Sequence, residues 1–306
     1  MSAVTGQGGP SDVAAEAGDS VYSGSAGGRE VWHPLPRRRP SRLSAFAPGM
    51  LTIRAPISAR ARQILVVSSV LVPVLAWLLL SASGRVNPDF LPSPAAVWTA
   101  GVEMIGSGQL LSDTYASLQR VLIGFGLAVA VSVPLGLLMG TFRAGQAAFE
   151  PVIGLLRYLP ASAFIPLVTI WLGLGEPSKI AILFIGTVFF NTLMTADVVR
   201  QVPGNLINVS YTLGARRGEV VRKVIVRHSL PGMVDAIRVN AAAAWNFVVI
   251  AELIAAESGL GYRIARSQRF LATDRIFAVL VVIALIGLIT DIALRLLRDR
   301  LGRWAV

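Results

Sequence analysis

Six long apolar segments divide this chain and leave few folds open to it. They lie at about residues 64–83, 115–141, 149–172, 178–198, 233–255 and 276–297. A run of roughly 18 or more apolar residues is long enough to cross the hydrocarbon of a membrane as an α-helix. A membrane β-barrel would need short segments in which apolar and polar residues alternate, and the sequence has none. We therefore predict an all-α, polytopic membrane protein with six transmembrane helices.

The composition agrees with a membrane protein. Only 15% of the residues are charged, compared with about 25% in soluble domains. The net charge of +11 would also suit a nucleic-acid-binding protein. However, the arginines lie at the ends of the apolar segments and in the loops between them. Basic residues in those places are typical of membrane topology and of contact with lipid headgroups, so we predict contact with membrane lipid and none with nucleic acid.

The first 62 residues differ from the rest of the chain. They are rich in Gly, Ser, Ala and Pro, and they contain a run of three arginines at 37–39. A segment with so little apolar surface cannot offset the entropy that ordering costs. We therefore predict a disordered basic tail at 1–62, followed by a membrane domain at 63–306.

The placement of basic residues predicts the orientation of the chain. Because Lys and Arg are enriched on the cytoplasmic side of membranes, we expect the tail, the 142–148 loop, the 199–231 loop and the C-terminus to be cytoplasmic. The 258–275 loop should then face outward, although it holds four arginines. Three of these are spaced by three residues and are predicted to line one face of a short interfacial helix: Arg263, Arg266 and Arg269.

The sequence carries no catalytic or nucleotide-binding motif. It has no cysteine, and its two histidines, His33 and His228, are too scattered to suggest a metal centre. A phosphate-binding P-loop requires a Gly-Lys-Ser/Thr sequence, whereas neither lysine, Lys179 or Lys223, follows a glycine. We predict that the chain is not an enzyme and has no cofactor of its own.

Polar residues inside apolar segments are expensive in lipid, and they are therefore candidates for function. Trp245 and Asn246 lie near the middle of the fifth segment, at the depth where transporter binding sites tend to lie. Glu252 lies near its outer end and is expected to pair with an arginine of the following loop. The residues predicted to line a translocation path, with ordinary packing as the alternative, are Arg157, Pro160, Asn191, Trp245, Asn246 and Glu252.

Proline and glycine shape two of the segments. Pro160 and Pro166 remove backbone donors from the third segment, which predicts a kinked helix that either lines a pore or simply packs with a bend. Arg157, in the same segment, has the alternative of reaching the headgroups with its long side chain. Gly136 and Gly140 form a G-x-x-x-G pattern that favours close packing of helices.

Several stretches, in the correct order, carry a family resemblance. They are SLQRVLIGFGLAVAVSVPLGLLMG at 117–140, IPLVTIWLGLGEPSKI at 165–180, the polar and basic 208–232 loop, and AWNFVVIAELIAAESGLGY at 244–262. From about residue 88 to its C-terminus, the chain resembles the inner-membrane permeases of nitrate/sulfonate/taurine-type bacterial ABC importers, which are type I importer permeases. The resemblance implies a multi-pass protein of the bacterial cell membrane with both termini cytoplasmic.

The resemblance also implies a coupling element in the loop before the fifth span. In this family the EAA loop forms a small helix that fits a groove on a separate ATPase, and here Asn208, Val209 and Ser210 occupy the Glu-Ala-Ala positions without an acidic residue. Gly214 is in register, and a Leu-Pro pair follows. The implied coupling residues are Asn208, Val209, Ser210, Gly214, Arg216, Arg217, Leu230 and Pro231.

The implied assembly has several partners. They are a dimer of ABC ATPase subunits that holds ATP and Mg²⁺, a second permease copy, and an extracytoplasmic solute-binding protein. The implied solute is a small one, such as a sulfonate, taurine or nitrate. Two alternatives stay open: a secondary transporter driven by an ion gradient, which often shows inverted repeats and buried acidic relays, and a membrane scaffold without transport.

Overall fold

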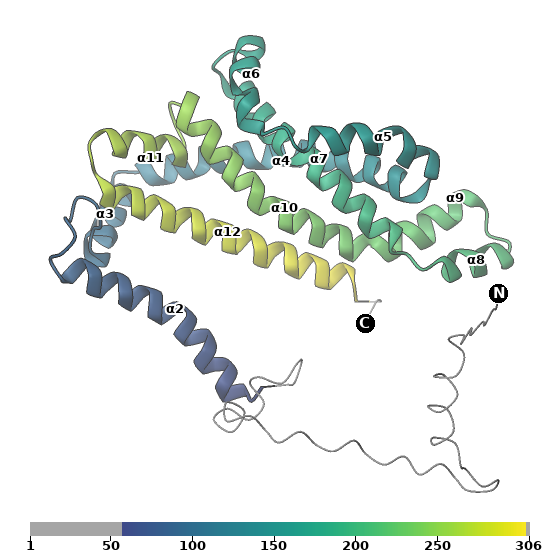
Figure 1. Cartoon of the computed structure of the whole chain (residues 1–306), viewed down its shortest axis with the longest axis horizontal. Coiled ribbons are helices and arrows are strands. Elements are labelled where there is room, and N and C mark those ends of the chain that lie inside the picture. Colours follow the sequence, from purple (N-terminus) through teal and green to yellow (C-terminus); the bar gives the residue numbers. More distant parts are fainter. Residues whose placement is uncertain (1–56, 304–306) are drawn as a thin grey trace, which may run out of the picture. The chain divides into compact units, whose positions relative to one another are not determined.

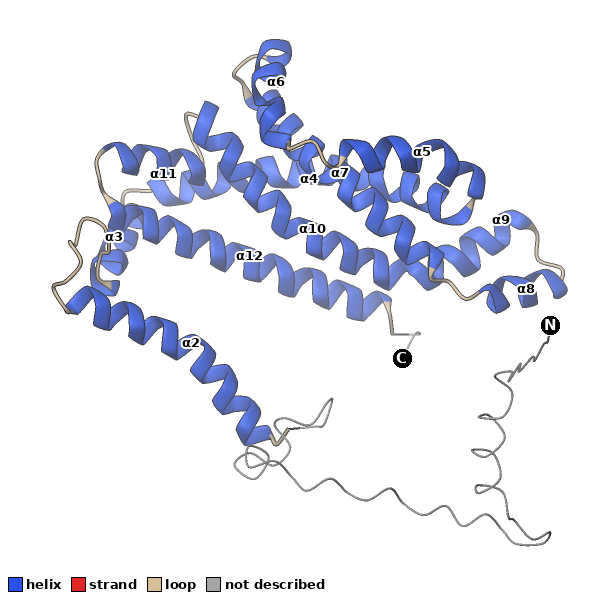
Figure 2. Cartoon of the chain, in the orientation of Figure 1, coloured by secondary structure: helices blue, strands red, loops and turns tan. Residues whose placement is uncertain are grey.

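The computed structural model describes residues 57–303, and every regular element in this range is helical (Figure 2). The predicted tail at 1–62 thus lies outside the described residues, apart from 57–62. In chain order the elements are α2 (Ala59–Ala82), α3 (Pro94–Gly106), α4 (Gln109–Thr141), α5 (Arg143–Leu156), the 3₁₀-helix η1 (Ala161–Phe164), α6 (Ile165–Leu172), α7 (Glu176–Arg200), α8 (Gly204–Thr212), α9 (Arg217–Glu219), the π-helix η2 (Val220–Ile225), α10 (Val226–Ala255), α11 (Leu260–Arg269) and α12 (Thr273–Leu301).

Five helical runs in the described residues are long and apolar enough to cross a membrane: Ala59–Ala82, Gln109–Thr141, Glu176–Arg200, Arg217–Ile254 and Thr273–Leu301. A sixth span is present if Arg143–Leu156 and Ala161–Leu172, which are bent by 81° relative to each other, count as one. The prediction of an all-α membrane protein is confirmed, and that of six spans is confirmed on this count.

The third predicted span, at 149–172, is not one continuous helix. Pro160 has an extended backbone (φ −65°, ψ 124°) and precedes η1. A proline there donates no backbone hydrogen bond and disfavours a helical conformation in the residue before it, so α5 ends at Leu156. Pro166, by contrast, lies in the first turn of α6, where a helix tolerates proline. The predicted kink therefore exists, and Pro160 rather than Pro166 lies at it.

The core is built on α4, α7 and α10. Helices α4 and α7 pack closely along their length, and α10 contacts both. Glycines on α4 allow this approach: a Cβ on Gly136 would lie 2.6 Å from the Cβ of Thr195, and one on Gly140 would lie 2.5 Å from the Cβ of Val199. Such separations are far shorter than real side-chain contacts, so the predicted packing role of the G-x-x-x-G pattern is confirmed.

The bundle has two distinct ends. Helices α7 and α10 run in opposite directions, and the segment that joins them contains α8 (Figure 1). Helix α11 follows α10 and therefore lies at the opposite end from α8. We refer to these as the α8 end and the α11 end.

The segment between α7 and α10 is shorter than the predicted 199–231 loop. Helix α7 continues to Arg200, and a new helical run begins at Arg217, so only 201–216 connects them. The polar composition of 217–231 suggested a loop. However, arginine, lysine and glutamate are good helix formers, and here they continue the helix beyond its apolar, membrane-spanning part.

Helix α2 differs from the other long helices because none of its residues is buried. Residues 69–303 form one compact unit, whereas 57–68 belong to a separate one. Within the larger unit, the indole N–H of Trp77 donates to the carbonyl of Pro92 at 3.0 Å, and its ring stacks on Phe277 with centroids 5.6 Å apart. The remaining apolar side chains of α2 are available to lipid or to another chain.

Candidate coupling surface and polar core

The α8 end presents a short helix that stands out from the bundle. None of the residues of α8 is buried, and Asn208, Val209 and Ser210 all belong to it. Its apolar side chains are well exposed: Val209 is 56% exposed and Leu213, at its C-terminal end, is 82% exposed. Exposed apolar side chains on a small helix are typical of a surface that docks into a groove.

Gly214 ends α8 in a specific way. Its φ of +82° is left-handed, the Gly214 N–H donates to the carbonyl of Tyr211 at 2.9 Å, and the Ala215 N–H donates to that of Ser210 at 3.0 Å. These two bonds define a Schellman motif, in which glycine is preferred because other residues are strained at this φ. The turn at Gly214 fixes where α8 stops.

Arg216 and Arg217 start the next helical run, and they differ in their contacts. The backbone N–H of Arg216 donates to the carboxylate of Glu219 at 3.0 Å, and Lys223 forms an ion pair with the same carboxylate at 2.9 Å. The guanidinium of Arg217 lies over the ring of Phe142, 5.2 Å from its centroid. Because Phe142 lies in the turn between α4 and α5, Arg217 links the segment 201–216 to these two helices as well.

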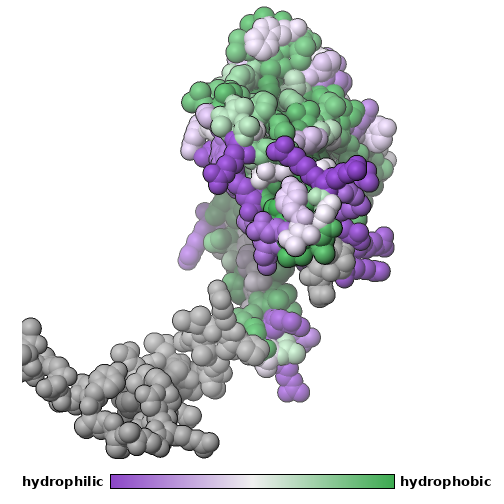
Figure 3. Space-filling model, turned by 90° about the vertical axis from the view of Figure 1, so that its right-hand side faces the viewer, coloured by the Kyte–Doolittle hydropathy of each residue, from purple (hydrophilic) through white to green (hydrophobic). Residues whose placement is uncertain are grey.

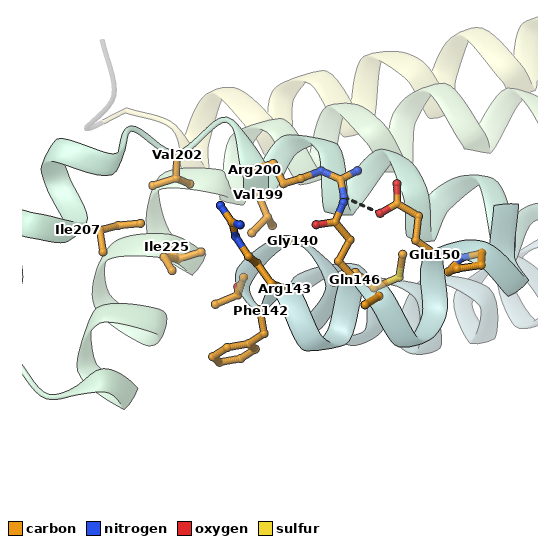
Figure 4. A pocket seen from close by; sticks show the side chains of 14 residues that line it. Gly140, Phe142, Arg143, Gln146, Glu150, Val199, Arg200, Val202, Ile207 and Ile225 are labelled. Carbon is orange, nitrogen blue, oxygen red and sulfur yellow. Dashed lines mark hydrogen bonds and ion pairs between the residues drawn. The ribbon is translucent and has the colours of Figure 1, made fainter.

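A cavity of about 780 Å³ lies beside this segment (Figure 4). The α4–α5 turn, the end of α7 and Ile207 of α8 enclose it. Figure 4 shows Arg200 of α7 and Glu150 of α5 facing each other, joined by an ion pair of 3.2 Å. Viewed from the α8 end, hydrophilic side chains gather over this part of the molecule, with hydrophobic surface next to them (Figure 3). The α8 end therefore combines exposed apolar side chains, such as Val209 and Leu213, with a hydrophilic surround.

Leu230 and Pro231 do not belong to the α8 surface. Both lie inside α10 and are partly buried. Leu230 packs against a small apolar cluster that includes Val199 and Ile225, and the ring of Pro231 lies close to Gly302 after α12. Their polar neighbours suggested a loop, but this stretch is helical, so the structure does not bring the two to the surface that carries Asn208.

The candidate path residues are spread over different environments. Arg157 and Pro160 lie at the break between α5 and η1, and the Arg157 guanidinium lies over the ring of its neighbour Tyr158. Trp245 is buried in the core at 5% exposure, whereas the adjacent Asn246 is exposed. The structure thus places Trp245 and Asn246 on different faces of α10, and only Asn246 is on the surface of the chain.

Asn191 belongs to a polar cluster that is enclosed by three helices. Its amide nitrogen donates to the hydroxyl of Ser132 on α4, and its carbonyl oxygen accepts from the amide of Asn240 on α10 at 3.3 Å. Asn191 is fully buried. Inside this chain it therefore joins α4, α7 and α10, and it does not line an open path.

The most extensive polar network lies at the α11 end, around Glu252. Glu252 is 1% exposed, and it pairs with Arg120 of α4 at 2.6 Å. Arg120 also pairs with Glu176 at 2.6 Å, and Glu176 accepts from Lys179 at 2.9 Å. The expected pairing of Glu252 with an arginine of the following loop was wrong, because α4 supplies a closer partner from inside the bundle.

Backbone amides of the turn after α10 complete this network. The Gly259 N–H donates to Asp113 at 2.9 Å, the Leu260 N–H to the hydroxyl of Ser117 at 2.8 Å, and the Gly261 N–H to Glu252 at 2.8 Å. A Cβ on Gly259, where φ is +116°, would lie 2.4 Å from the carboxyl carbon of Glu252. The turn therefore wraps closely around the carboxylate and holds the start of α11 in place.

Arg263 adds a further anchor. Its Nε donates to Asp113 at 2.6 Å, and one of its Nη atoms donates to Gln109 at 2.7 Å. A short helix does form at the predicted place, but Arg263 is buried whereas Arg266 and Arg269 are exposed. The three arginines therefore do not share one exposed face.

Sequence reasoning missed Arg120 as the partner of Glu252, and it missed Asp113 and Glu176 as members of the same network. A signal existed for Arg120, since it is a charged residue within the predicted 115–141 span. No signal in the sequence pairs it with residues 56 and 132 positions away. Within residues 57–303, no three His, Cys, Asp or Glu side chains lie close enough together to hold a metal ion.

Comparisons with known proteins agree with this architecture. Residues 132–303 match the family described as the binding-protein-dependent transport system inner membrane component. The chain is 40% identical to a probable ABC transporter permease protein of Brucella melitensis biotype 1, over 74% of this chain and 92% of that protein. It is 33% identical to the taurine transport system permease protein TauC of Escherichia coli, over 79% of this chain and 90% of TauC.

Another relative, from Bacillus subtilis, is named for aliphatic sulfonates transport and is 31% identical over 76% of this chain and 84% of its own length. Among solved structures, a chain of the inward-facing MetNI methionine ABC transporter matches with a TM-score of 0.58 at 20% identity, over 64% of this chain and 97% of that one. At that identity the likeness concerns the fold alone. The helical bundle, the exposed helix α8 and these matches together place the chain in the family of inner-membrane components of binding-protein-dependent transport systems.

Proposed function

We propose that this chain is the permease subunit of an ATP-driven importer, and that α8 is the element through which a separate ATPase acts on it. The observation that carries the proposal is the geometry of α8, a nine-residue helix with no buried residue, which a Schellman turn ends at Gly214. Ile207 anchors α8 to the apolar cluster around Val199 and Ile225. Val209 and Leu213 are instead exposed among residues 57–303, and a groove on a partner would cover them.

The connections of α8 suggest how movement passes into the bundle. On one side it follows α7 after only a few residues, and on the other side the run that becomes α10 begins at Arg217. The Arg217–Phe142 contact adds a link to α4 and α5. A displacement of α8 by the ATPase would therefore act on four helices together. ATP binding and hydrolysis would bias the bundle between two conformations, to the extent that the ATPase binds each one differently.

The proposed assembly contains two permease copies, two ATPase subunits that hold ATP and Mg²⁺, and an extracytoplasmic solute-binding protein. We propose the bacterial inner membrane as its location, with α8 and both termini on the cytoplasmic side. Relatives named for taurine and for aliphatic sulfonates support a small sulfonate-type solute, although another relative is named for riboflavin transport. Asn246, which is exposed near the middle of α10, is the strongest candidate for contact with the solute.

A reconstitution experiment tests this function against a secondary transporter. The chain would be purified alone and together with its candidate ATPase, and each preparation would be placed in proteoliposomes with the binding protein and taurine. We expect ATP hydrolysis and uptake only when the ATPase is present, because the chain has no P-loop lysine. Uptake by the chain alone under a proton or sodium gradient, without ATP, would contradict the proposal.

A further inference from the structure

A small cavity at the α11 end is lined by three guanidinium groups and no carboxylate. Its volume is about 260 Å³, and it is lined by Arg263, Arg266, Ser267, Phe270, Ala272 and Arg275. A second cavity of about 340 Å³ shares Arg266 and Phe270 with it and adds Arg269. The two cavities together are lined by all four arginines of the 258–275 segment. That segment is the one whose positive charge disagrees with the predicted orientation of the chain.

The arginines around this cavity are not equally neutralised. Arg263 is paired with Asp113 at 2.6 Å, and Arg275 pairs with Glu103 at 3.2 Å, with both side chains largely exposed. Within residues 57–303, the one hydrogen bond of the Arg266 side chain goes to the hydroxyl of Tyr262, at a long 3.5 Å. Among the described residues, Arg269 forms no ion pair. Glu252 also lines the second cavity, but its carboxylate is paired with Arg120. Arg266 and Arg269 therefore have no ion-pair partner among residues 57–303.

The site is also held rigid. The turn before α11 is anchored by three backbone hydrogen bonds to Asp113, Ser117 and Glu252, and Arg263 is buried against Asp113. A ligand would therefore meet a preformed wall, and would have to order only the exposed Arg266 and Arg269 side chains. Preorganisation of this kind lowers the entropy that binding costs.

The chemistry of the lining selects an oxyanion. A guanidinium presents its N–H donors in a planar fork that matches two oxygens of a sulfonate, sulfate, phosphate or carboxylate group. The hydroxyl of Ser267 offers a further donor, and Phe270, which is 75% exposed, offers an apolar wall to a short carbon chain. The volume suits a headgroup of a few heavy atoms.

We propose that this cavity binds an oxyanion headgroup, with Arg266 as the main ligand and Arg269 and Arg275 beside it. The headgroup is either that of a free organic anion or the phosphate of an anionic lipid, since both have the same recognition chemistry. Binding here requires neither the ATPase nor ATP, so the proposal stands apart from the proposed transport function.

The test uses the full chain, without ATPase, in nanodiscs. Isothermal titration with ethanesulfonate and with inorganic sulfate would be run in pure phosphatidylcholine, in low-salt buffer. A parallel arm would measure enrichment of phosphatidylglycerol around the chain in mixed nanodiscs. The variants are Arg266→Gln and the charge-retaining Arg266→Lys. The matched control is Arg300→Gln. It removes an exposed arginine near the C-terminal end of α12, whereas the cavity lies at the N-terminal end of that helix.

We expect at least one arm to show binding that Arg266→Gln weakens by about tenfold or more, because a charge-assisted bidentate contact is lost. Arg266→Lys should recover part of it, and Arg300→Gln should match the unmodified chain. Binding of ethanesulfonate or sulfate identifies a free anion as the ligand, and enrichment of phosphatidylglycerol alone identifies a lipid headgroup. Absence of binding in both arms, or equal binding by Arg266→Gln and Arg300→Gln, would overturn the proposal.

Discussion

Replacing Arg120 with methionine should destabilise the α11 end far more than loss of a surface ion pair would. The Arg120 and Glu252 side chains are only 3% and 0% exposed. In Arg120→Met, Glu252 would keep its bonds to Ser117 and to the Gly261 N–H but would lose its cation. Removing one partner of a buried ion pair costs roughly 3–5 kcal/mol. At about 2–4 °C per kcal/mol for a domain of this size, the unfolding temperature should fall by roughly 6–20 °C.

The assay is thermal unfolding of the purified chain in nanodiscs, followed by tryptophan fluorescence. Lys223→Gln is the control, because the Lys223–Glu219 pair is 64% and 44% exposed and surface ion pairs of this kind contribute little to stability. The double variant Arg120→Met/Glu252→Gln should recover at least half of the loss, since it removes the unpaired charge but keeps an acceptor for Gly261. The reasoning would be refuted by an Arg120→Met variant that unfolds within a degree or two of the control, or by a double variant that is less stable than either single change.

Three further predictions concern other parts of the chain. Gly136→Val should weaken the packing of α4 on α7 by about 1–3 kcal/mol, because its Cβ would meet Thr195. The matched change Gly126→Val, where the space is open, should cost far less in the same unfolding assay. Asn246→Trp should reduce solute uptake in proteoliposomes while the complex still assembles, and normal uptake would remove Asn246 from the path. A cysteine in place of Ser210, in this cysteine-free chain, should react with an impermeant thiol reagent only after the membrane is opened, and labelling of intact cells would reverse the proposed orientation.

The helical class and the positions of the spans could be predicted from the sequence because hydrophobic length is a local property. The break at Pro160 is local as well, and the proline alone indicated it. The 217–231 stretch was predicted as a loop because its charge was interpreted as a boundary, whereas charged residues with good helix propensity simply continue the helix past the membrane.

The partners of the polar residues could not be predicted in the same way. Glu252 had arginines close by in sequence, and yet Arg120 on α4 pairs with it, because packing of α4 against α10 decides which side chains meet. The opposite environments of Trp245 and Asn246 likewise depend on the rotation of α10 within the bundle. The depth of a residue in the membrane can be estimated from the sequence. Which face of a nearly apolar helix points into the bundle cannot be estimated in this way.

The most direct test of the coupling role of α8 is retention of the ATPase on the purified permease. Gly214→Asp would place a side chain at a φ of +82°, where most non-glycine residues are strained by about 1–2 kcal/mol, and it would add a charge at the end of the docking helix. Arg217→Ala would remove a contact with Phe142 but leave α8 and its turn intact. We predict that Gly214→Asp loses most of the bound ATPase and of solute uptake, while Arg217→Ala keeps most of both. Equal ATPase retention by the two variants, with normal uptake in each, would contradict the assignment of α8 as the coupling element.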